Sequence, residues 1–269
     1  MTYFATSRAD WVDMMAKISE DMLKSGQLNR GTVHAQKTNV PMHELTHERI
    51  MVQVPQNKQL LQEMMQPNLP WAEDHFQERV SGQPLNPPPS NEWWPFAQQG
   101  NEVHKQDGKF SHTYPERFWP RYTGDGKANL GIRFLYGDLD NLVDLLRKNL
   151  GTRQAYLPVW FPEDLWAAQA GERVPCTLGY HFLLTLHDKD FKLDIEYHMR
   201  SCDFVRFFTD DAYMAARLLQ WVCNRVLVEP GDLYMNIGSF HCFVDDKLTL
   251  ENYRKVRQQQ WFERLATNL

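Results

Sequence analysis

A cysteine, an arginine–serine pair and a histidine stand in the second half of the chain in contexts that suit chemistry. Cys176 follows a proline and precedes a predicted strand, and its basic neighbour Arg173 could lower its pKa, as a nucleophilic thiol requires. Arg200 and Ser201 end another predicted strand, where a guanidinium and a hydroxyl suit a phosphate. His241 follows a turn of small residues. Taken singly, Cys176 and His241 fit structural roles better, and the Arg–Ser pair fits a strand-end salt bridge equally well.

The composition limits the classes of protein to consider. The chain of 269 residues is 42% hydrophobic, with a formal net charge of -5 and a mean hydropathy of -0.57. It has no apolar run of the roughly 18 residues that a membrane span needs, and its acidic balance argues against non-specific binding to nucleic acid. No export signal is recognisable, so we expect a cytoplasmic protein with reduced thiols. Without a Cys-x-x-Cys pair no metal site is predicted, and we expect Cys202, Cys223 and Cys242 to be buried packing residues.

Helical and strand-like segments alternate irregularly, which predicts an α+β fold in a single domain, residues 1–269. Helices are predicted at 1–26, at 58–81 with a break at Pro67 and Pro70, at 139–149, at 211–227 with Thr209 or Asp210 as N-cap, and at the charged C-terminus. Strands are predicted at 49–54, 154–160, 179–186, 192–199 and 233–237. Segment 81–95, with five prolines and two tryptophans, is predicted to be an ordered, packed loop, and 99–127 a second irregular segment.

The order and spacing of the motifs resemble the thymidylate synthase family, and more closely its pyrimidine-nucleotide hydroxymethylase branch known from phages. The motifs follow one another in the family's order: Pro-Cys, a hairpin, Arg-Ser-x-Asp, a helix, Pro-Gly-Asp and Gly-x-x-His. The resemblance spans roughly residues 70–245; residues 1–60 match poorly, 81–95 looks like an insertion, and the family's arginine-containing phosphate loop is not recognisable. It implies a three-layer α+β fold in which a large twisted mixed sheet forms a back-to-back homodimer.

The resemblance assigns roles around the thiol. Cys176 matches the nucleophile that attacks C6 of the pyrimidine ring, and Thr177 stands where the synthases carry a histidine and the hydroxymethylases do not. Arg200 and Ser201 match the pair that holds the nucleotide phosphate and supports the thiolate. Asp203 matches the acid that hydrogen-bonds the pterin of the folate co-substrate.

Further substrate contacts are implied with two departures from the family pattern. Arg153 matches one of two arginines that reach the phosphate in the neighbouring subunit, and Gln154 replaces the second. His241 matches the sugar-contacting histidine, but Phe243 replaces a tyrosine whose hydroxyl faces the 3′-OH of the sugar. Tyr114 matches a tyrosine near the reacting thiol.

The same resemblance implies a folate side and a catalytic carboxylate. Trp93 and Trp94 correspond to tryptophans that line the site of 5,10-methylenetetrahydrofolate. Glu73 aligns with the glutamate that organises proton-shuttling waters, with Glu63 and Glu78 as competing candidates and a plain surface role as the alternative.

Asp211 carries the prediction of base selectivity. It stands where the synthases have an asparagine that recognises N3–H and O4 of uracil. Cytosine presents an N4 amino donor, which a carboxylate accepts, whereas an ionised Asp opposite O4 costs on the order of 1–3 kcal/mol. The alternative role is the N-cap of the helix, for which Thr209 and Asp210 are also available.

The expected product follows from the C-terminal sequence, which does not match the apolar, proline-containing tail that excludes water in the synthases. The resemblance therefore implies hydroxymethylation of dCMP by 5,10-methylenetetrahydrofolate and water, in a phage-encoded cytoplasmic enzyme that serves DNA modification. A C5 methyltransferase acting on dCMP, CMP or dUMP, a ribonucleotide substrate allowed by Phe243, and a non-catalytic nucleotide-binding relative stay open as alternatives.

Overall fold

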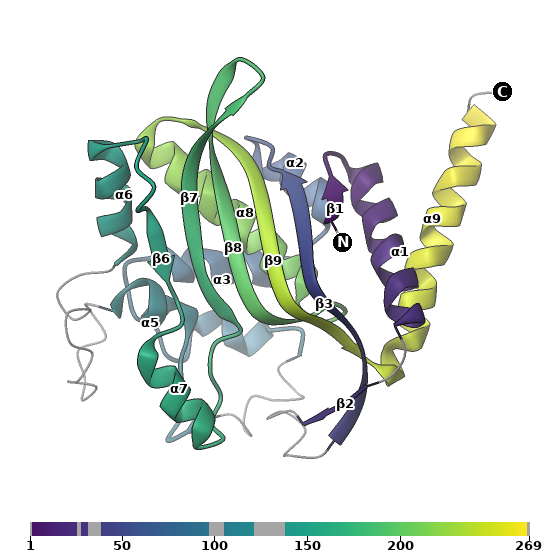
Figure 1. The fold of residues 1–269 in the computed structure, drawn as a ribbon, viewed down its shortest axis with the longest axis horizontal. Helices are drawn as coiled ribbons and strands as arrows, with labels where there is room; N and C mark the ends of the chain where they lie inside the picture. Colours follow the sequence, from purple (N-terminus) through teal and green to yellow (C-terminus); the bar gives the residue numbers. More distant parts are fainter. Residues whose placement is uncertain (1, 26–27, 32–38, 97–104, 121–137, 268–269) are drawn as a thin grey trace.

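One mixed, twisted sheet dominates the computed structural model, which describes residues 2–25, 28–31, 39–96, 105–120 and 138–267 (Figure 1). Its strand order is β1-β3-β9-β8-β7-β6, with β2 beside β3. β1 pairs with β3, and β8 with β9, in parallel, and the other neighbours are antiparallel. The strands are β1 (Thr2–Ala5), β2 (Leu28–Gly31), β3 (Asn39–Gln53), β6 (Tyr156–Pro158), β7 (Thr177–His187), β8 (Asp190–Asp203) and β9 (Glu229–Phe243), and a separate small hairpin is formed by β4 (Lys105–Gln106) and β5 (Lys109–Phe110).

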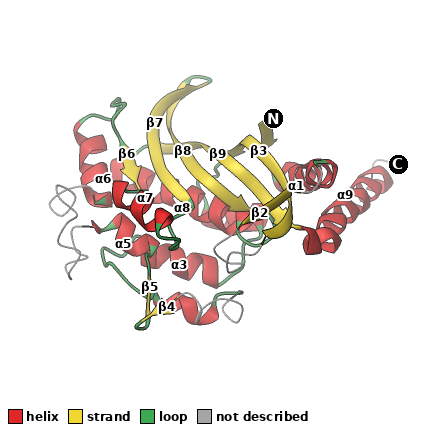
Figure 2. Cartoon of the chain, turned by 60° about the horizontal axis from the view of Figure 1, so that its bottom comes forward, coloured by secondary structure: helices red, strands yellow, loops and turns green. Residues whose placement is uncertain are grey.

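Helices gather on one face of this sheet around α8 (Phe208–Val226), which packs on β8 and β9 (Figure 2). The others are α1 (Arg8–Lys24), α2 (Lys58–Met65), α3 (Trp71–Arg79), α5 (Tyr114–Phe118), α6 (Leu139–Lys148), α7 (Pro162–Gln169) and α9 (Lys247–Thr267), with two short 3-10 turns, η1 (Pro89–Trp93) and η4 (Val244–Asp246). The predicted α+β class is confirmed.

Aromatic packing fixes where α8 begins. Phe208 is fully buried, stacks on Trp11 of α1 with ring centroids 5.7 Å apart, and lies 5.1 Å from the ring of Phe240 on β9. The helix therefore starts at Phe208 with Phe207 as its N-cap. This start also places Asp211 in the first turn of α8, inside the helix.

The predicted N-caps of this helix, Thr209 and Asp210, are therefore wrong. The buried Asp210 carboxylate instead accepts hydrogen bonds from the backbone N–H and the side-chain amide of Asn68, at 2.8 and 2.7 Å. Asp210 thus ties the segment before α3 to α8, and both helices begin at the same end of the helical layer.

The other predicted elements are present with different bounds. The helix predicted at 1–26 is divided into β1 and α1, and the prolines near 67–70 separate α2 from α3 as predicted. The predicted inner strands are parts of the longer β3, β7, β8 and β9, whereas β6 covers only three residues. Segment 81–95 is irregular and packed, with Ser90 fully buried. β2 and α7 were not predicted, and part of 99–127 lies outside the described residues.

The other face of the sheet carries partly exposed polar and aromatic side chains from neighbouring strands. Glu196 lies 3.6 Å from His181, 3.7 Å from His198 and 3.8 Å from Arg49. Tyr156 packs beside both histidines and is 44% exposed. This face is polar enough to meet water and aromatic enough to pack against another surface.

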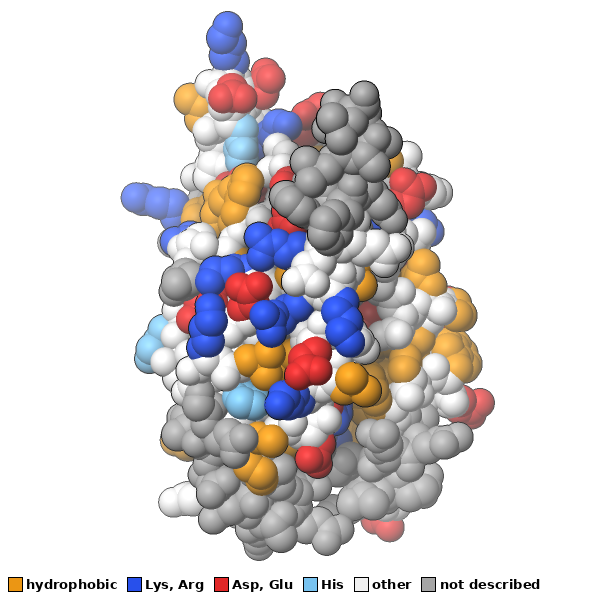
Figure 3. Space-filling model, turned by 90° about the vertical axis from the view of Figure 1, so that its right-hand side faces the viewer, with side chains coloured by type: hydrophobic (Ala, Val, Ile, Leu, Met, Phe, Trp, Pro, Cys, Tyr) orange, Lys and Arg blue, Asp and Glu red, His pale blue; other side chains and the backbone are white. Residues whose placement is uncertain are grey.

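The side of the molecule formed by α1 and α9 carries basic side chains interleaved with acidic ones (Figure 3). Arg257 of α9 lies 3.2 Å from Asp13 of α1, and Arg254 lies 3.8 Å from Glu20. These pairs hold α9 along α1. In the described part of the chain, no helix is both long enough and apolar enough to cross a membrane.

Candidate active site

Cys176 lies directly before β7, beside the end of β8. The backbone N–H of Arg200 donates to the Cys176 carbonyl at 2.9 Å, and the Arg200 Nε donates to the Pro175 carbonyl at 2.9 Å. These bonds place the Arg200 Nη2 3.9 Å from the Cys176 Sγ. Burial raises the pKa of the Cys176 thiol, while the positive charges of Arg200 and Arg173 oppose this shift. Arg200, which the family resemblance assigned to the thiolate, thus lies near the thiol, and the charge of its sequence neighbour Arg173 acts on it as well.

Ser201 and His241 meet across the parallel pair of β8 and β9. The Ser201 Oγ lies 3.5 Å from the His241 Nδ1, because the register places Ser201 opposite Ser239 and Asp203 opposite His241. Burial lowers the pKa of His241, and the carboxylate of Asp203 opposes the shift. The predicted nucleotide-binding residues on these strands therefore lie together at one end of the sheet.

Asp203 ends β8 and shapes the turn into α8. Its carboxylate accepts hydrogen bonds from the backbone N–H groups of Val205 and Arg206, both at 3.0 Å, and from the Arg206 guanidinium at 3.2 Å. Arg206 also pairs with Asp246 at 2.7 Å. Burial raises the pKa of Asp203 even though these hydrogen bonds favour its charged form. Asp203 therefore has a structural role in the turn, and its predicted contact with the folate co-substrate stays a prediction.

Asp211, the predicted base-recognition residue, lies in the first turn of α8. Its charge acts on Cys176 and on Tyr114. Burial raises the pKa of Asp211 to about 7, and the nearby guanidinium of Arg79 opposes this shift. Among the described residues, no side chain donates a hydrogen bond to the Asp211 carboxylate.

Arg79 is a residue of this centre that was not singled out from the sequence. It ends α3, is 4% exposed, and its guanidinium lies 4.0 Å from the centre of the Tyr114 ring. A signal was present, because Ala72, Phe76 and Arg79 follow one another at helical spacing and form a buried face. A charged residue on such a face is unusual in a core helix.

Tyr114 connects this cation to the residue after the nucleophile. Its hydroxyl lies 3.0 Å from the Thr177 Oγ1, which lies 2.8 Å from the hydroxyl of Tyr197. Burial raises the pKa of Tyr114, and the charges of Asp211 and Cys176 raise it further. Tyr114 is therefore a neutral hydroxyl that can take part in proton transfer beside Cys176.

Glu73 lies elsewhere, between α3 and α8. Its carboxylate accepts hydrogen bonds from the Arg217 guanidinium, at 3.0 Å to each oxygen, and from the Tyr213 hydroxyl at 2.6 Å. Burial favours the neutral acid, but the hydrogen bonds from Arg217 and Tyr213 outweigh it and lower the pKa of Glu73 to about 2. None of its described partners belongs to the cluster around Cys176.

The two competing glutamates are not placed beside the thiol either. Glu78 accepts hydrogen bonds from the backbone N–H and the hydroxyl of Ser90, at 2.6 and 2.5 Å, so it anchors the proline-rich loop. The Glu63 side chain is exposed on α2. Of the ionisable residues on α3, Arg79 is the one whose charge acts on both Asp211 and Tyr114.

The Cys176 thiol thus lies near the Arg200 guanidinium and interacts electrostatically with Asp211 and Tyr114. A sequence model of the thymidylate synthase family matches residues 14–265. The chain belongs to the thymidylate synthase family. It is therefore a transferase of one-carbon units to C5 of pyrimidine nucleotides, with methylenetetrahydrofolate as the co-substrate. The match also begins well before residue 70, so the family relationship extends further toward the N-terminus than was predicted.

The residues predicted for the folate side of a thymidylate synthase fit an aromatic ligand. The Trp94 ring stacks on Phe207 with centroids 5.9 Å apart, and Trp93 is 45% exposed. The backbone N–H of Phe207 donates to the Asp203 carbonyl at 3.1 Å, so the aromatic stack and the buried acid are neighbours. The half-buried Trp94 indole, which reaches the Asp203 segment through Phe207, suits stacking on a pterin ring.

Arg153, the predicted cross-subunit residue of the family, points to no partner in the described part of its own chain. Its side chain is exposed just before β6, and its carbonyl lies 3.1 Å from the His181 Nε2. This location is beside the polar face of the sheet, where Tyr156, His181 and His198 gather.

Proposed function

We propose that this member of the thymidylate synthase family is a deoxycytidylate 5-hydroxymethyltransferase. It combines dCMP, 5,10-methylenetetrahydrofolate and water into 5-hydroxymethyl-dCMP and tetrahydrofolate. The observation that carries this proposal is the Asp211 carboxylate, whose charge acts on Cys176 and Tyr114 and which accepts no hydrogen bond from a described side chain. A carboxylate matches the N4 amino group of cytosine and opposes the O4 of uracil.

Cys176 acts as the nucleophile in this proposal. Its sulfur donates an electron pair to C6 of the ring, and the C5–C6 π electrons move toward C4 and N3, which makes C5 nucleophilic. Asp211 accepts a hydrogen bond from N4, and N3 takes up a proton as the S–C6 bond forms. An acid whose pKa is about 7 can supply that proton at neutral pH and take it back when the thiolate leaves.

Arg200, Ser201 and His241 bind the nucleotide in this proposal, the first two at the phosphate and His241 at the sugar. Arg200 has a second effect, because its charge stabilises the thiolate form of Cys176, which burial disfavours. Arg153 reaches the phosphate of a second subunit. The partly exposed aromatic face near Arg153 supports a homodimer that pairs the two sheets.

Asp203, Trp93 and Trp94 bind the folate co-substrate, which supplies the carbon at the oxidation level of formaldehyde. Trp93 and Trp94 offer ring faces for stacking, and Asp203 is a buried hydrogen-bonding acid. Tyr114 moves a proton at C5 through its hydroxyl. Glu73 remains a predicted proton-relay residue, although its ion pair with Arg217 supports a role in fixing α3 on α8.

The choice of water over hydride determines the product. α9, which ends the described chain, lies along α1, where Arg257 pairs with Asp13. Water that reaches the methylene carbon at C5 gives a hydroxymethyl group, whereas its exclusion leads to hydride transfer and a methyl group. The packing of α9 on α1 supports access of water. We propose further that the chain works as one catalytic domain.

Mass spectrometry of the product tests this function. Purified enzyme is incubated with dCMP and 5,10-methylenetetrahydrofolate, with CMP and dUMP in parallel. We expect dCMP to gain about 30 Da, because a hydroxymethyl group replaces the hydrogen at C5 and adds CH2O, without formation of dihydrofolate. A gain of about 14 Da with dihydrofolate identifies a methyltransferase and contradicts the proposal. Nucleotide binding without tritium release from C5 identifies a non-catalytic relative, and a preference for dUMP or CMP contradicts the substrate.

A further inference from the structure

Arg79 is a buried cation without a counter-ion among the described residues. It is 4% exposed, its Nε is buried without a hydrogen-bond partner, and it forms no ion pair with a described carboxylate. Two other largely buried guanidinium groups are paired: Arg117 contacts Asp164 at 2.7 Å, and Arg217 contacts Glu73 at 3.0 Å. A buried charge that lacks such a partner destabilises a fold. Stability alone therefore does not explain an arginine at this position.

The group that this guanidinium contacts is the ring of Tyr114. The Arg79 Cζ lies 4.0 Å from the ring centre, and the Arg79 carbonyl accepts a hydrogen bond from the Trp119 indole at 2.8 Å. Tyr114 begins α5 and Trp119 is its C-cap, so both ends of α5 are held against the end of α3. A cation over a ring face is attracted by the negative charge of that face, most strongly where water is excluded. The contact therefore fixes the ring of Tyr114.

The hydroxyl of the same ring belongs to a chain of three hydroxyl groups. The Tyr114 hydroxyl lies 3.0 Å from the Thr177 Oγ1, which lies 2.8 Å from the Tyr197 hydroxyl. Thr177 is fully buried and directly follows Cys176, so the chain ends beside the nucleophile. The oxygen positions allow donation in the order Tyr197, Thr177, Tyr114. Each hydroxyl has one hydrogen, so in this order the Tyr114 hydrogen is not used within the chain and is available to a ligand.

We propose that Arg79 is a positioning residue for Tyr114, which holds the phenol ring with its hydroxyl beside Cys176 and, through its charge over the ring, strengthens that hydroxyl as a proton donor. This inference rests on the function proposed above, in which Tyr114 moves a proton at C5, and deepens it. Negative charge builds on the phenol oxygen as its proton shifts toward a partner, and a cation over the ring stabilises that charge. An apolar side chain in the same place would hold the ring without this effect.

The charges around Tyr114 agree with the direction of this effect. Burial raises the pKa of Tyr114, the charges of Asp211 and Cys176 raise it further, and Arg79 opposes them. The other titratable neighbours are Tyr180 of β7, Tyr197 of β8 and Arg173 in the segment before β7. Of the two cations in this group, Arg79 is the one that lies over the Tyr114 ring. Loss of its guanidinium should therefore weaken the phenol as an acid.

A double-mutant cycle tests whether Arg79 acts through Tyr114. Tritium release from C5 is measured for the full-length Arg79→Met, Tyr114→Phe and double variants. We expect Arg79→Met to lower kcat about tenfold with little change in KM, and the double variant to be no slower than Tyr114→Phe, because the hydroxyl is already gone. Arg79→Met should fold at least as stably as the wild type, since it removes an unpaired buried charge. A further tenfold loss in the double variant overturns the inference, as does a wild-type rate in Arg79→Met.

A measurement without nucleotide separates this inference from the proposed function. A fluorinated tyrosine in place of Tyr114 alone has a more acidic phenol, so fluorine NMR can follow its titration midpoint. We expect the midpoint to rise by about one pH unit, a tenfold weaker acid, in Arg79→Met, and to rise less in Arg79→Lys, which keeps the charge. An unchanged midpoint in Arg79→Met overturns the inference whatever the substrate is. A raised midpoint in a protein that releases no tritium from any pyrimidine nucleotide supports the assignment of Arg79 to Tyr114 and contradicts the proposed function.

Arg217→Met is the matched control. It also removes a guanidinium that lies over an aromatic ring, 4.8 Å from the centre of Phe76, but this one is paired with Glu73. We expect it to lower the stability, to leave the midpoint at position 114 unchanged, and to have an effect on the rate that adds to that of Tyr114→Phe. A shift of the midpoint equal to that of Arg79→Met would show a general effect of losing a cation and overturn the assignment to Arg79.

Discussion

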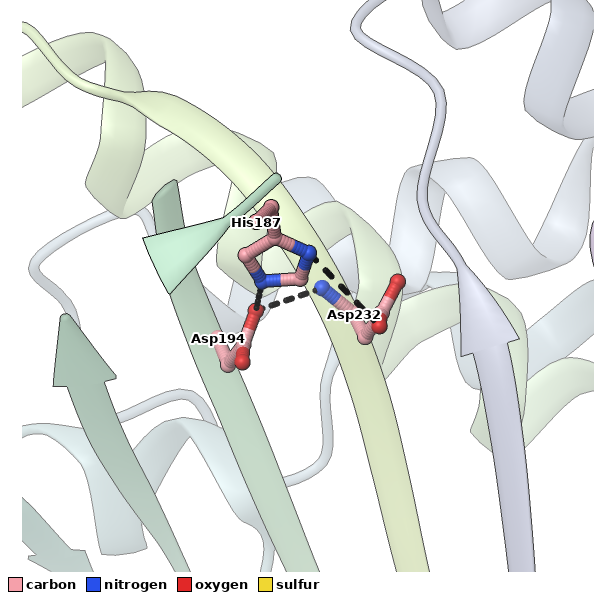
Figure 4. A group of neighbouring side chains, drawn as sticks. All are labelled: His187, Asp194 and Asp232. Atoms are coloured by element: carbon pink, nitrogen blue, oxygen red, sulfur yellow. Dashed lines mark hydrogen bonds and ion pairs between the residues drawn. The ribbon is translucent and has the colours of Figure 1, made fainter. Parts of the chain in front are cut away.

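Two clusters of polar side chains lie at opposite ends of the same three strands. At the end near the β7–β8 hairpin, the Asp194 carboxylate accepts hydrogen bonds from the backbone N–H of Asp232 at 2.7 Å and from His187 at 2.8 Å (Figure 4). It also accepts one from the Thr185 hydroxyl at 2.5 Å. Gly231 is needed beside it, because a Cβ there would overlap this carboxylate. We call these residues the hairpin cluster.

At the other end, Tyr114 lies under the Arg79 guanidinium and interacts electrostatically with Asp211 and Cys176; we call Arg79, Tyr114 and Asp211 the substrate cluster. Its acid receives no hydrogen bond from a described side chain, and the Arg79 Nε is buried without a partner. Unsatisfied buried groups each cost about 1–3 kcal/mol, more when they are charged. The difference between the clusters shows where the fold uses polar groups to stabilise itself and where it keeps them available for a ligand.

The hairpin cluster has the residue types of a metal site, but its bonding explains it without one. His187, Asp194 and Asp232 offer ligand atoms within 4.8 Å of one another. Both Asp194 oxygens already accept hydrogen bonds from described groups. The residue types alone therefore do not tell a structural cluster from one that is available to a ligand. The number of hydrogen bonds that the polar groups already make tells them apart better.

Loss of the nucleophile should have the largest effect on activity. Cys176→Ala removes the group that activates C5, so we expect tritium release from C5-labelled dCMP to fall by at least about a thousandfold, with little change in stability. Cys223→Ala, at a buried position of α8, is the control. It should lose on the order of 1 kcal/mol of stability and retain turnover. Equal loss in both variants would contradict the role of Cys176.

Breaking the hairpin cluster should have the next largest effect, on stability alone. Asp194→Asn removes the charge that three donors share, and we expect the free energy of unfolding in urea to fall by about 3 kcal/mol. Turnover per folded molecule should stay the same, because the cluster is at the far end of the strands from Cys176. A large loss of turnover at full folding would show that the cluster serves the reaction.

Asp211→Asn should change selectivity with no loss of stability. An amide can donate to O4 of uracil, so we expect the ratio of kcat/KM for dCMP to that for dUMP to fall by roughly 10–100-fold. Asn at this position also removes an acid whose carboxylate has no hydrogen-bonding partner among the described residues. Unchanged selectivity with intact folding would exclude Asp211 from base recognition.

The same variant has a predicted pH dependence. The pKa of Asp211 is raised from 3.8 to about 7, so the native state binds more protons than the unfolded state within that interval. The free energy of unfolding therefore falls as pH rises through the interval, by about 2 kcal/mol once partial exposure is allowed for. Asp211→Asn lacks this loss. Urea unfolding of both proteins near pH 5 and pH 8 measures the difference, and equal slopes would contradict the raised pKa.

The motifs that could be predicted are those that lie on adjacent strand ends. Cys176 and Arg200 lie close to predicted strands, and pairing of β7, β8 and β9 brings their ends together. His241 was predicted to follow a turn of small residues, which is wrong, because it lies inside the continuous strand β9. The bounds were less predictable, because β8 and β9 continue through polar residues that no alternation of apolar side chains marks. The start of α8 was missed because buried packing of Phe208 outweighs the capping preference of Asp210.

The sequence by itself determined the order of the motifs, the thiol and the acid that suit a pyrimidine, because these depend on residue type and position along the chain. Only the tertiary structure decided which charged side chains contact one another. Glu73 and Arg79 lie on the same helix, six residues apart. At about 100° per residue, the two side chains differ in direction by about 240° beyond one full turn, so they lie on different faces of the helix. Glu73 therefore pairs with Arg217, while Arg79 lies over Tyr114. No local pattern chooses between these faces, since the choice depends on what α3 packs against.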